Sequence, residues 1–352
     1  MCGIAGFIHK SIGPEEAKNK ITKMINIINH RGPDDTCALI GKNFCVAAAR
    51  LAIEKIKYGQ QPIVDDKKRY ILSFNGEIFN YKNLQKKFLG NNNKLSNDSK
   101  VLVNLFQVIK NKIKISKKIN GMFSYVVFDK LEKKIIFSTD VQGEKRLYKY
   151  EDNENFILSS TIKSVLAFIK KKDLNIEALK NYFCTRHLLI KDNTIYKNLS
   201  IIEQGNYFEH SFKTKRFTKK QFDNPLNWID KKKYQKFNNM SENEIIEFFH
   251  KIFLKQLKLM IPKVKFGSIC SGGIDSSLQT AMINKINKDF IIGTIHHKKK
   301  DKITEDLSKF ENRLNKKIHK YYATIEKNKK IASRCVNEIG IPFLTHDFIG
   351  RY

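Results

Sequence analysis

The chain begins with residues 1–10, MCGIAGFIHK. Residues 2–9 form an apolar run of strand length, which predicts a buried β-strand with Cys2 at its start. The small side chain at position 2 favours removal of the initiator Met. Cys2 would then carry both a thiol and a free α-amine, whose reference pKa near ~8 suits it to act as the base for that thiol. Taken alone, Cys2 is explained more simply as a small residue that permits this removal.

The sequence around this strand predicts a layered α+β domain over residues 1–210, because strand runs and helix runs do not alternate in βαβ order. Further strands are expected at residues 44–49, 70–75, 122–129, 134–139 and 155–159. Helices are expected at residues 15–29, 82–88, 99–110 and 176–183.

The composition and periodicity of the sequence change after residue 210. Residues 211–240 are polar, basic and weakly periodic, which predicts a linker. In residues 241–352, Ser241 and Glu244 form a capping box before a helix. The apolar side chains of that helix fall on one face: Ile245, Phe248, Phe249, Ile252, Phe253 and Leu257. Strands at 264–270, 290–295 and 318–323 then alternate with helices from about 275, at 304–314 and at 325–338. This alternation predicts a partial, doubly wound α/β domain with a parallel sheet.

The length, composition and charge of the chain limit the classes of protein to which it can belong. The chain has 352 residues, enough for two domains, and 41% hydrophobic residues. Its six cysteines have no metal-ligand spacing, the start has no basic signal region, and no apolar run approaches membrane-spanning length. We therefore expect a cytoplasmic protein without membrane attachment. The net charge of +31 follows a general lysine bias without a single basic stripe, so we expect no nucleic-acid partner.

Six motifs follow one another in the first 150 residues, and their order is informative. They are MCGIAGF at 1–7, NHRGPD at 29–34, Arg50-Leu51 with Gln61-Pro62, SFNGEIFNY at 73–81, GMFSY at 121–125, and Asp140 with Gly143, Lys145, Leu147 and Tyr148. In this order they resemble the class II glutamine amidotransferases. That resemblance implies an N-terminal-nucleophile αββα sandwich in which Cys2 attacks the side-chain amide of glutamine.

The resemblance also implies roles for five further residues. Asn75 and Gly76 match the oxyanion-hole pair, and Glu77 matches an acidic residue of the glutamine pocket. Asp98 matches the residue that pairs with the ammonium of glutamine, and it could also cap the helix after it, either in place of that role or together with it. The guanidinium of Arg50 suits the carboxylate of glutamine through a bidentate fork. Outside these roles, we expect Arg31 and Asp34 to form an ion pair that positions their loop.

A second motif, CSGGIDSS at residues 270–277, joins a predicted strand to a predicted helix. Its glycines and the helix N-terminus suit an anionic ligand, and the order differs from a Walker A loop. It resembles the SGGxDS pyrophosphate loop of ATP pyrophosphatases. The resemblance implies that pyrophosphate is held by Ser271, Gly272, Gly273, Ser276 and Ser277. It also implies Mg²⁺ near Asp275 and adenosine against Ile269 and Ile292.

Together the two motif sets resemble the glutamine-hydrolysing asparagine synthases. That family implies glutamine, aspartate and ATP as substrates, Mg²⁺ as cofactor and Glu305 as a further acidic residue, and it leaves a homodimer open. Three departures stand out: Thr139 and Thr161 replace the family's usual Arg and Glu, and the sequence stops before the family's SGxGxDE loop. We therefore expect impaired synthesis. Two alternatives remain: an amidotransferase for another carboxylate, and a glutaminase-only or non-catalytic binding protein.

Overall fold

The computed structural model describes residues 1–53, 59–90, 97–185, 193–297 and 307–323, together with residues 331, 333–335 and 337–340. The chain divides into two compact units. Unit 1 comprises Met1–Ile229 with Glu338–Leu344, and unit 2 comprises Asp230–Asn337 with Thr345–Tyr352. Among the described residues, no helix is both long and apolar enough to cross a membrane.

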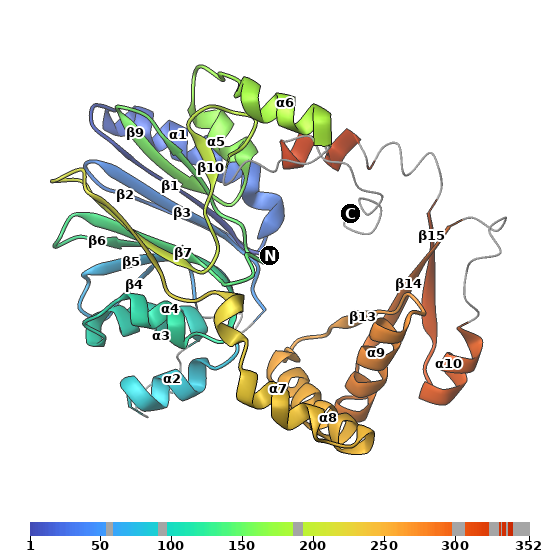
Figure 1. The fold of residues 1–352 in the computed structure, drawn as a ribbon. Helices are drawn as coiled ribbons and strands as arrows, with labels where there is room; N and C mark the ends of the chain where they lie inside the picture. The colour runs from blue at the N-terminus through green and yellow to red at the C-terminus, as the bar shows by residue number, and fades with distance from the viewer. Residues whose placement is uncertain are drawn as a thin grey trace. The chain divides into compact units, whose positions relative to one another are not determined.

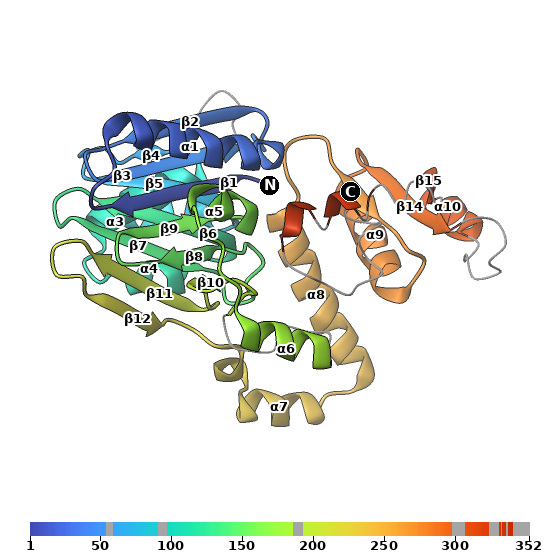
Figure 2. The same ribbon diagram turned by 90° about the horizontal axis from the view of Figure 1, so that it is seen from above.

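In its described part, unit 1 is built on two six-stranded antiparallel sheets (Figure 1, Figure 2). Sheet A runs in the order β10 (Leu199–Ile201), β8 (Tyr148–Glu151), β9 (Asn155–Ser159), β1 (Gly3–His9), β3 (Phe44–Arg50) and β2 (Asp35–Ile40). Sheet B runs in the order β12 (Phe217–Gln221), β11 (Asn206–Ser211), β7 (Lys134–Thr139), β6 (Gly121–Asp129), β5 (Tyr70–Ile78) and β4 (Ile63–Val64).

Helices cover the outer face of each sheet, which gives the predicted N-terminal-nucleophile αββα sandwich. On sheet A lie α1 (Pro14–Ile28) and α5 (Ile162–Phe168). On sheet B lies α3 (Asp98–Val108), with α2 (Tyr81–Phe88) packed on it and α4 (Ile113–Lys118) in the same core. The remaining helices of this unit are η1 (Asn29–Arg31), α6 (Ile176–Thr185) and η2 (Pro225–Trp228). Each sheet forms a hydrophobic core with its helices, and a third hydrophobic core fills the space between the two sheets. The prediction of layered α+β packing is confirmed.

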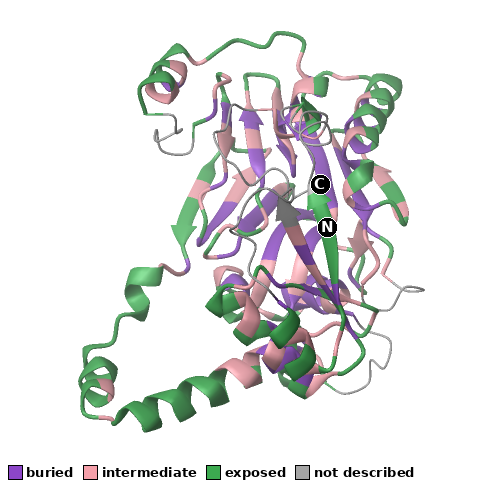
Figure 3. Ribbon diagram, turned by 90° about the vertical axis from the view of Figure 1, so that its right-hand side faces the viewer, coloured by how far each residue is buried: buried purple, intermediate pink, exposed green. Residues whose placement is uncertain are grey.

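Local chemistry explains why the central elements form. Every residue of β1 is buried, because the strand has helix α1 on one face and the opposite sheet on the other (Figure 3). Helix α1 begins with Pro14, whose missing N–H costs nothing in a first turn, and acidic Glu15 and Glu16 follow it there. Its buried residues repeat at helical spacing and face sheet A: Ala17, Ile21, Met24, Ile25 and Ile28.

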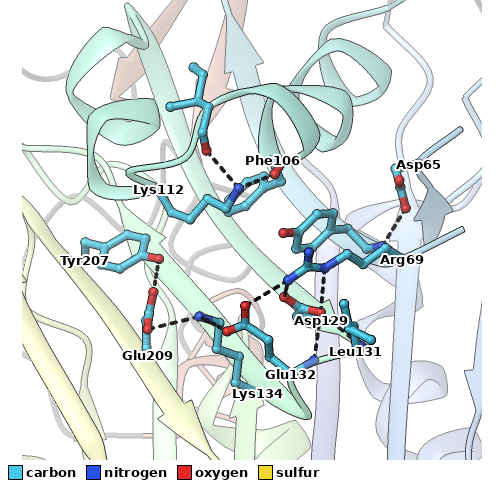
Figure 4. Close-up of polar contacts among 12 residues, drawn as sticks. Asp65, Arg69, Phe106, Lys112, Asp129, Leu131, Glu132, Lys134, Tyr207 and Glu209 are labelled. Carbon is cyan, nitrogen blue, oxygen red and sulfur yellow. Dashed lines mark hydrogen bonds and ion pairs between the residues drawn. The ribbon is translucent and has the colours of Figure 1, made fainter. Parts of the chain in front are cut away.

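A chain of ion pairs ties the strands of sheet B together near the β6–β7 turn (Figure 4). Buried Asp129 accepts hydrogen bonds from Arg69 at 3.0 and 2.6 Å, and from the backbone N–H groups of Leu131 and Glu132. Glu132 also pairs with Lys134. Burial opposes ionisation of Asp129, but these donors outweigh it and lower the pKa of its carboxyl group. The turn is therefore held by an ionised, fully satisfied carboxylate.

Unit 2 contains a three-stranded parallel sheet in its described part, in the order β13 (Gly267–Ile269), β14 (Ile291–His297) and β15 (Ile318–Ala323). Its helices are α7 (Lys231–Asn238), α8 (Glu242–Met260), α9 (Ile274–Ile286) and α10 (Ser308–Leu314). The alternation of parallel strands with helices matches the prediction, whereas the doubly wound pyrophosphate-loop fold stays a prediction. The helix predicted at 325–338 falls largely outside the described residues.

The structure differs from expectation in two places, at helix α8 of unit 2 and in the segment that precedes unit 2. The capping box forms, but most of the apolar face of α8 is exposed, including Phe248 and Phe249, since only its C-terminal turns contact the unit 2 core. The segment expected to be a linker begins with ordered structure. Strand β12 pairs with β11 in sheet B, so unit 1 reaches Ile229. The sequence did not reveal this edge strand because every residue of it after Phe217 is polar, and an exposed edge strand needs few apolar side chains.

Candidate active site around Cys2

Cys2 lies immediately before β1 and is half-buried. Its Sγ accepts a hydrogen bond from the Leu51 N–H at 3.4 Å and lies 3.7 Å from the Leu51 carbonyl oxygen. Arg31 Nε donates to the Cys2 carbonyl oxygen at 3.1 Å. The thiol is therefore held by the Leu51 backbone, and the backbone of Cys2 is held by the Arg31 side chain.

The loop at residues 29–34 supports the same arrangement. Asp34 Oδ2 accepts from the Ala52 N–H at 2.8 Å, and the Asp34 N–H donates to the Arg50 carbonyl oxygen at 3.2 Å. Arg31 and Asp34 were expected to position this loop by pairing with each other. In the structure, each side chain contacts the backbone next to the end of a strand. Arg31 donates to the carbonyl oxygen of Cys2, just before β1, and Asp34 accepts from the N–H of Ala52, just after β3.

The predicted oxyanion-hole residues lie at the same end of the sandwich. Asn75 is 1% exposed, and neither its Oδ1 nor its Nδ2 has a hydrogen-bond partner in the structure. Burying an amide without partners costs about 1–3 kcal/mol, so this side chain is held in a place where a ligand can satisfy it. Gly76 has φ +155°, and a Cβ there would lie 2.1 Å from the Met122 carbonyl oxygen. The close strand crossing therefore requires glycine.

All six residues predicted for the glutaminase half border one cavity of about 120 Å³. These are Cys2, Arg50, Asn75, Gly76, Glu77 and Asp98. They come from β3, β5, the first residue of α3 and the residue just before β1. Arg50 is buried although charged. The cavity thus joins a thiol, an amide with unsatisfied atoms, a guanidinium and two carboxylates, which is a suitable set for a zwitterion with an amide side chain.

The electrostatics of the site concern the thiol and the chain's α-amine. Burial raises the pKa of the Cys2 thiol, although the Leu51 N–H hydrogen bond opposes this effect. Burial also lowers the pKa of the Met1 α-amine. A thiol with a raised pKa needs a base to take its proton.

The structure settles which residue caps α3, a point that the sequence left open. The N-cap of α3 is Asn97, whose Oδ1 accepts from the Lys100 N–H at 2.8 Å. Asp98 is the first helical residue, and its carboxylate accepts from the N–H groups of Ser99 at 2.7 Å and Ile78 at 3.3 Å. Asp and Asn have nearly equal cap preference, so the sequence pair Asn97-Asp98 could not settle which one caps.

Gln61 and Lys145 also border the cavity, although the sequence-based expectations gave them no role. Gln61 Oε1 accepts from the Phe74 N–H at 2.7 Å and so supports the strand that carries Asn75. Lys145 reaches the cavity from a loop organised by buried Asp140, which accepts from the N–H groups of residues 142, 144 and 145. Both residues lie within the motifs quoted above, which is the signal that could have found them.

The residues of the second predicted site lie in unit 2, in the loop between β13 and α9. Gly272 has φ +94°, a conformation that favours glycine. Ser276 Oγ lies 3.0 Å from Ser271 Oγ and accepts from the Ser271 N–H at 3.1 Å. Gly273 is the N-cap of α9, Asp275 is exposed, and Ser277 Oγ lies 3.7 Å from the buried Cys270 Sγ.

The structure does not bring the two predicted adenosine contacts together. Ile269 is 68% exposed, whereas Ile292 is 1% exposed and packs in the unit 2 core. In the β13–β14 register, Ile269 lies opposite Gly293 and Ile292 lies opposite Ser268, so the two isoleucines project from opposite faces. Position within a strand run does not reveal which face a residue uses. Glu305 lies outside the described residues.

Comparison with known proteins fits this geometry. A glutamine amidotransferase domain matches residues 1–223. The chain belongs to this family. The chain is 32% identical over 79% of its length to a putative glutamine-hydrolyzing asparagine synthetase 2 of Methanocaldococcus jannaschii, of which it covers 56%. It is 28% identical over 79% of its length to asparagine synthetase 2 of Bacillus subtilis, of which it covers 38%.

The chain therefore spans about half the length of the curated relatives it matches. Among solved structures, a glutamine phosphoribosylpyrophosphate amidotransferase from B. subtilis aligns over 99% of this chain and 92% of its own, with a TM-score of 0.45 and 11% identity.

Proposed function

We propose that the chain hydrolyses glutamine at Cys2 and delivers the ammonia to an ATP-activated carboxylate, with aspartate as the acceptor. The observation that carries the first half is the meeting of Cys2, Arg50 and Asp98 with the unsatisfied Asn75 amide in one cavity. The observation that favours aspartate is the similarity to asparagine synthetases.

The glutaminase step uses groups of this chain alone. After removal of Met1, the Cys2 α-amine takes the thiol proton, and Sγ bonds to the amide carbon of glutamine. Asn75 Nδ2 and the Gly76 N–H stabilise the oxyanion that forms. The C–N bond then breaks and ammonia leaves with the proton from the amine. Water hydrolyses the remaining thioester to glutamate and restores the thiol.

The substrate's charged ends suit two other residues. The Arg50 guanidinium would hold the α-carboxylate through a bidentate fork. The Asp98 carboxylate would hold the α-ammonium, while Glu77 borders the same cavity. Lys145, at the edge of this cavity, adds positive charge that favours an anionic end of the substrate.

The β13–α9 loop is a suitable place for the phosphates of ATP. Its serine hydroxyls are close together, Gly272 allows the backbone to approach a ligand, and the N-terminal amides of α9 favour an anion. No group of three metal-binding side chains occurs among the described residues. Mg²⁺ would therefore be coordinated by the Asp275 carboxylate together with phosphate oxygens, a common mode of coordination for this ion. Bound ATP would supply the group that makes the acceptor carboxylate reactive towards ammonia.

Product analysis tests the proposal. With glutamine, aspartate, ATP and Mg²⁺, the proposal expects glutamate, asparagine, AMP and pyrophosphate. Cys2→Ala should abolish glutamate formation, whereas the matched Cys37→Ala, at an exposed cysteine, should not. Retained hydrolysis in Cys2→Ala would refute the nucleophile.

The same assay separates the alternatives. Glutamate and ammonia without AMP would indicate a glutaminase-only protein, whereas AMP formed only with a different carboxylate would indicate another acceptor. No glutamate under any condition would favour a non-catalytic binding protein. ATP, Mg²⁺, aspartate and a homodimer stay predictions until then.

A further inference from the structure

A second and larger cavity lies at the opposite end of the unit 1 sandwich from Cys2. Its volume is about 950 Å³, near the upper end of the usual range for small-molecule sites. It is bordered by His9, the last residue of β1, whereas Cys2 directly precedes the first. Seven strand residues span about 20 Å, so the two cavities are separate.

Aromatic rings from both sheets border this cavity. Phe44 of sheet A stacks on Phe128 of sheet B, with ring centres 3.8 Å apart and planes at 21°. Phe156 of sheet A stacks on His210 of sheet B at 4.6 Å and 6°. All four rings border the cavity. A flat aromatic group could extend these stacks at little entropic cost, because the rings are already packed.

The charged residues around the cavity are unbalanced. Three acids border it, and each is already engaged: Glu151 pairs with Lys149, Glu154 pairs with Lys10, and Asp152 accepts from backbone N–H groups of its own turn. Besides Lys10, five lysines border it and form no ion pair within the described residues: Lys42, Lys130, Lys133, Lys213 and Lys215. The net field at the cavity therefore favours an anion.

Two buried polar atoms of side chains that border the cavity lack a hydrogen-bond partner among the described residues, His9 Nε2 and His210 Nδ1. His210 Nδ1 is buried and makes no hydrogen bond in the structure. Burial also lowers the pKa of His210, which keeps the imidazole neutral at pH 7. A neutral imidazole stacked on Phe156 could simply be a core side chain, but a ligand with polar edges would satisfy its ring nitrogen.

The lysine-bearing turns are held in place before any ligand arrives. The β6–β7 turn carries Lys130 and Lys133, and the Asp129 carboxylate fixes its backbone through the N–H groups of Leu131 and Glu132 (Figure 4). Such preorganisation lowers the entropy lost on binding.

We propose that this cavity binds a small aromatic anion, of which a nucleoside monophosphate is the representative. The base would lie against the Phe44–Phe128 and Phe156–His210 rings, and the phosphate would lie among the five lysines. This inference does not depend on the proposed glutamine chemistry.

The backbone offers conservative variants for a test. Lys133 and Lys215 have φ +50° and +53°, in the left-handed region, where asparagine is better tolerated than lysine. Lys133→Asn and Lys215→Asn thus remove charge without adding strain. Lys68 has φ +60° and does not border this cavity, so Lys68→Asn is the matched control.

Isothermal titration with GMP, guanosine and inorganic phosphate at low salt is the experiment. We expect GMP to bind the full chain more tightly than either of its parts. Removing one lysine–phosphate ion pair should weaken binding roughly tenfold, so Lys133→Asn with Lys215→Asn should bind GMP clearly more weakly, and Lys68→Asn should bind it unchanged. Cys2→Ala and Ser276→Ala should bind GMP as the wild type does, which separates this site from both sites of the proposed function.

Three results would overturn the proposal. One is no GMP binding by the wild type up to about 5 mM, a concentration that detects even millimolar affinity. Another is unchanged GMP affinity in the double lysine variant. The third is phosphate binding as tight as GMP binding, because the rings would then contribute nothing.

Discussion

Replacing Asn75 by alanine should separate activity from stability. The Asn75 side chain is 1% exposed, and both of its polar atoms lack partners among the residues that the structure describes. If Nδ2 serves the oxyanion, its loss removes about 3 kcal/mol of transition-state stabilisation, which is a fall of roughly 10²–10³ in kcat. The same change removes a buried, unsatisfied amide, whose burial costs about 1–3 kcal/mol. The stability gained by removing this unsatisfied amide offsets the loss caused by the small void left behind, so the free energy of unfolding should stay level or rise.

Ser73→Ala is the matched control for this variant. Ser73 lies two residues earlier on β5, on the same face and equally buried, but its Oγ donates to the Ala47 carbonyl oxygen at 3.4 Å and does not border the Cys2 cavity. Its replacement should destabilise the fold by about 1 kcal/mol and leave kcat unchanged.

The assay pairs initial rates of glutamate formation with denaturant unfolding, for wild type and both variants. The reasoning is refuted if Asn75→Ala keeps kcat within about threefold, roughly 0.6 kcal/mol, of the wild type. It is also refuted if the rate falls only in step with the folded fraction, since Asn75 would then be a structural residue.

Three further predictions concern the same unit. An uncleavable N-terminal extension should abolish glutaminase activity without unfolding the protein, because Cys2 would lose its free α-amine; rates with and without the extension test this. Gly76→Ala should lower both stability and activity, since a Cβ would lie 2.1 Å from the Met122 carbonyl oxygen; thermal unfolding and rates test this. Asp129→Asn should lower the free energy of unfolding at pH 7 by about 2 kcal/mol, discounted because Arg69 is 30% exposed. The folded pKa of Asp129 is lowered, so its contribution is present above the unfolded value of about 3.9 and is lost as pH falls below it; unfolding at pH 7, 5 and 3 tests this.

Each of these has a clear contrary outcome. Full activity of the extended chain would exclude the α-amine as the base. A Gly76→Ala protein as stable as the wild type would show that β5 and β6 can separate there. A gap between wild type and Asp129→Asn that widens towards pH 3 would contradict the sign of the pKa shift.

Much of unit 1 could be predicted because its signals are local. The bounds of β7 and β9 match the expected ranges, since each is a short apolar run between turn residues. Strands β2, β8 and β12 were missed because they are short or lie towards sheet edges, where an apolar pattern is not required. The capping box at Ser241 was correct for the same local reason.

The burial of a side chain, and the face of the helix or sheet on which it lies, could not be predicted so well from the sequence. Phe248 and Phe249 have the spacing of a core face, yet they are exposed, because burial depends on what another segment places against them. Ile269 and Ile292 were expected to share a ligand, yet strand register sends them to opposite faces. A one-residue step reverses the face of a strand residue, and no local property of an isoleucine records that step.

By itself, the sequence predicted Cys2 as the nucleophile, together with the order of its partner motifs and the strand that directly follows Cys2, because these depend on residue chemistry and short-range periodicity. Only the tertiary structure decided that Arg50, Asn75 and Asp98 meet Cys2 in one cavity while Lys133 and Lys215 gather at another. Those meetings join segments that lie far apart in the sequence, and such contacts are set by sheet order and packing, which local propensity does not encode.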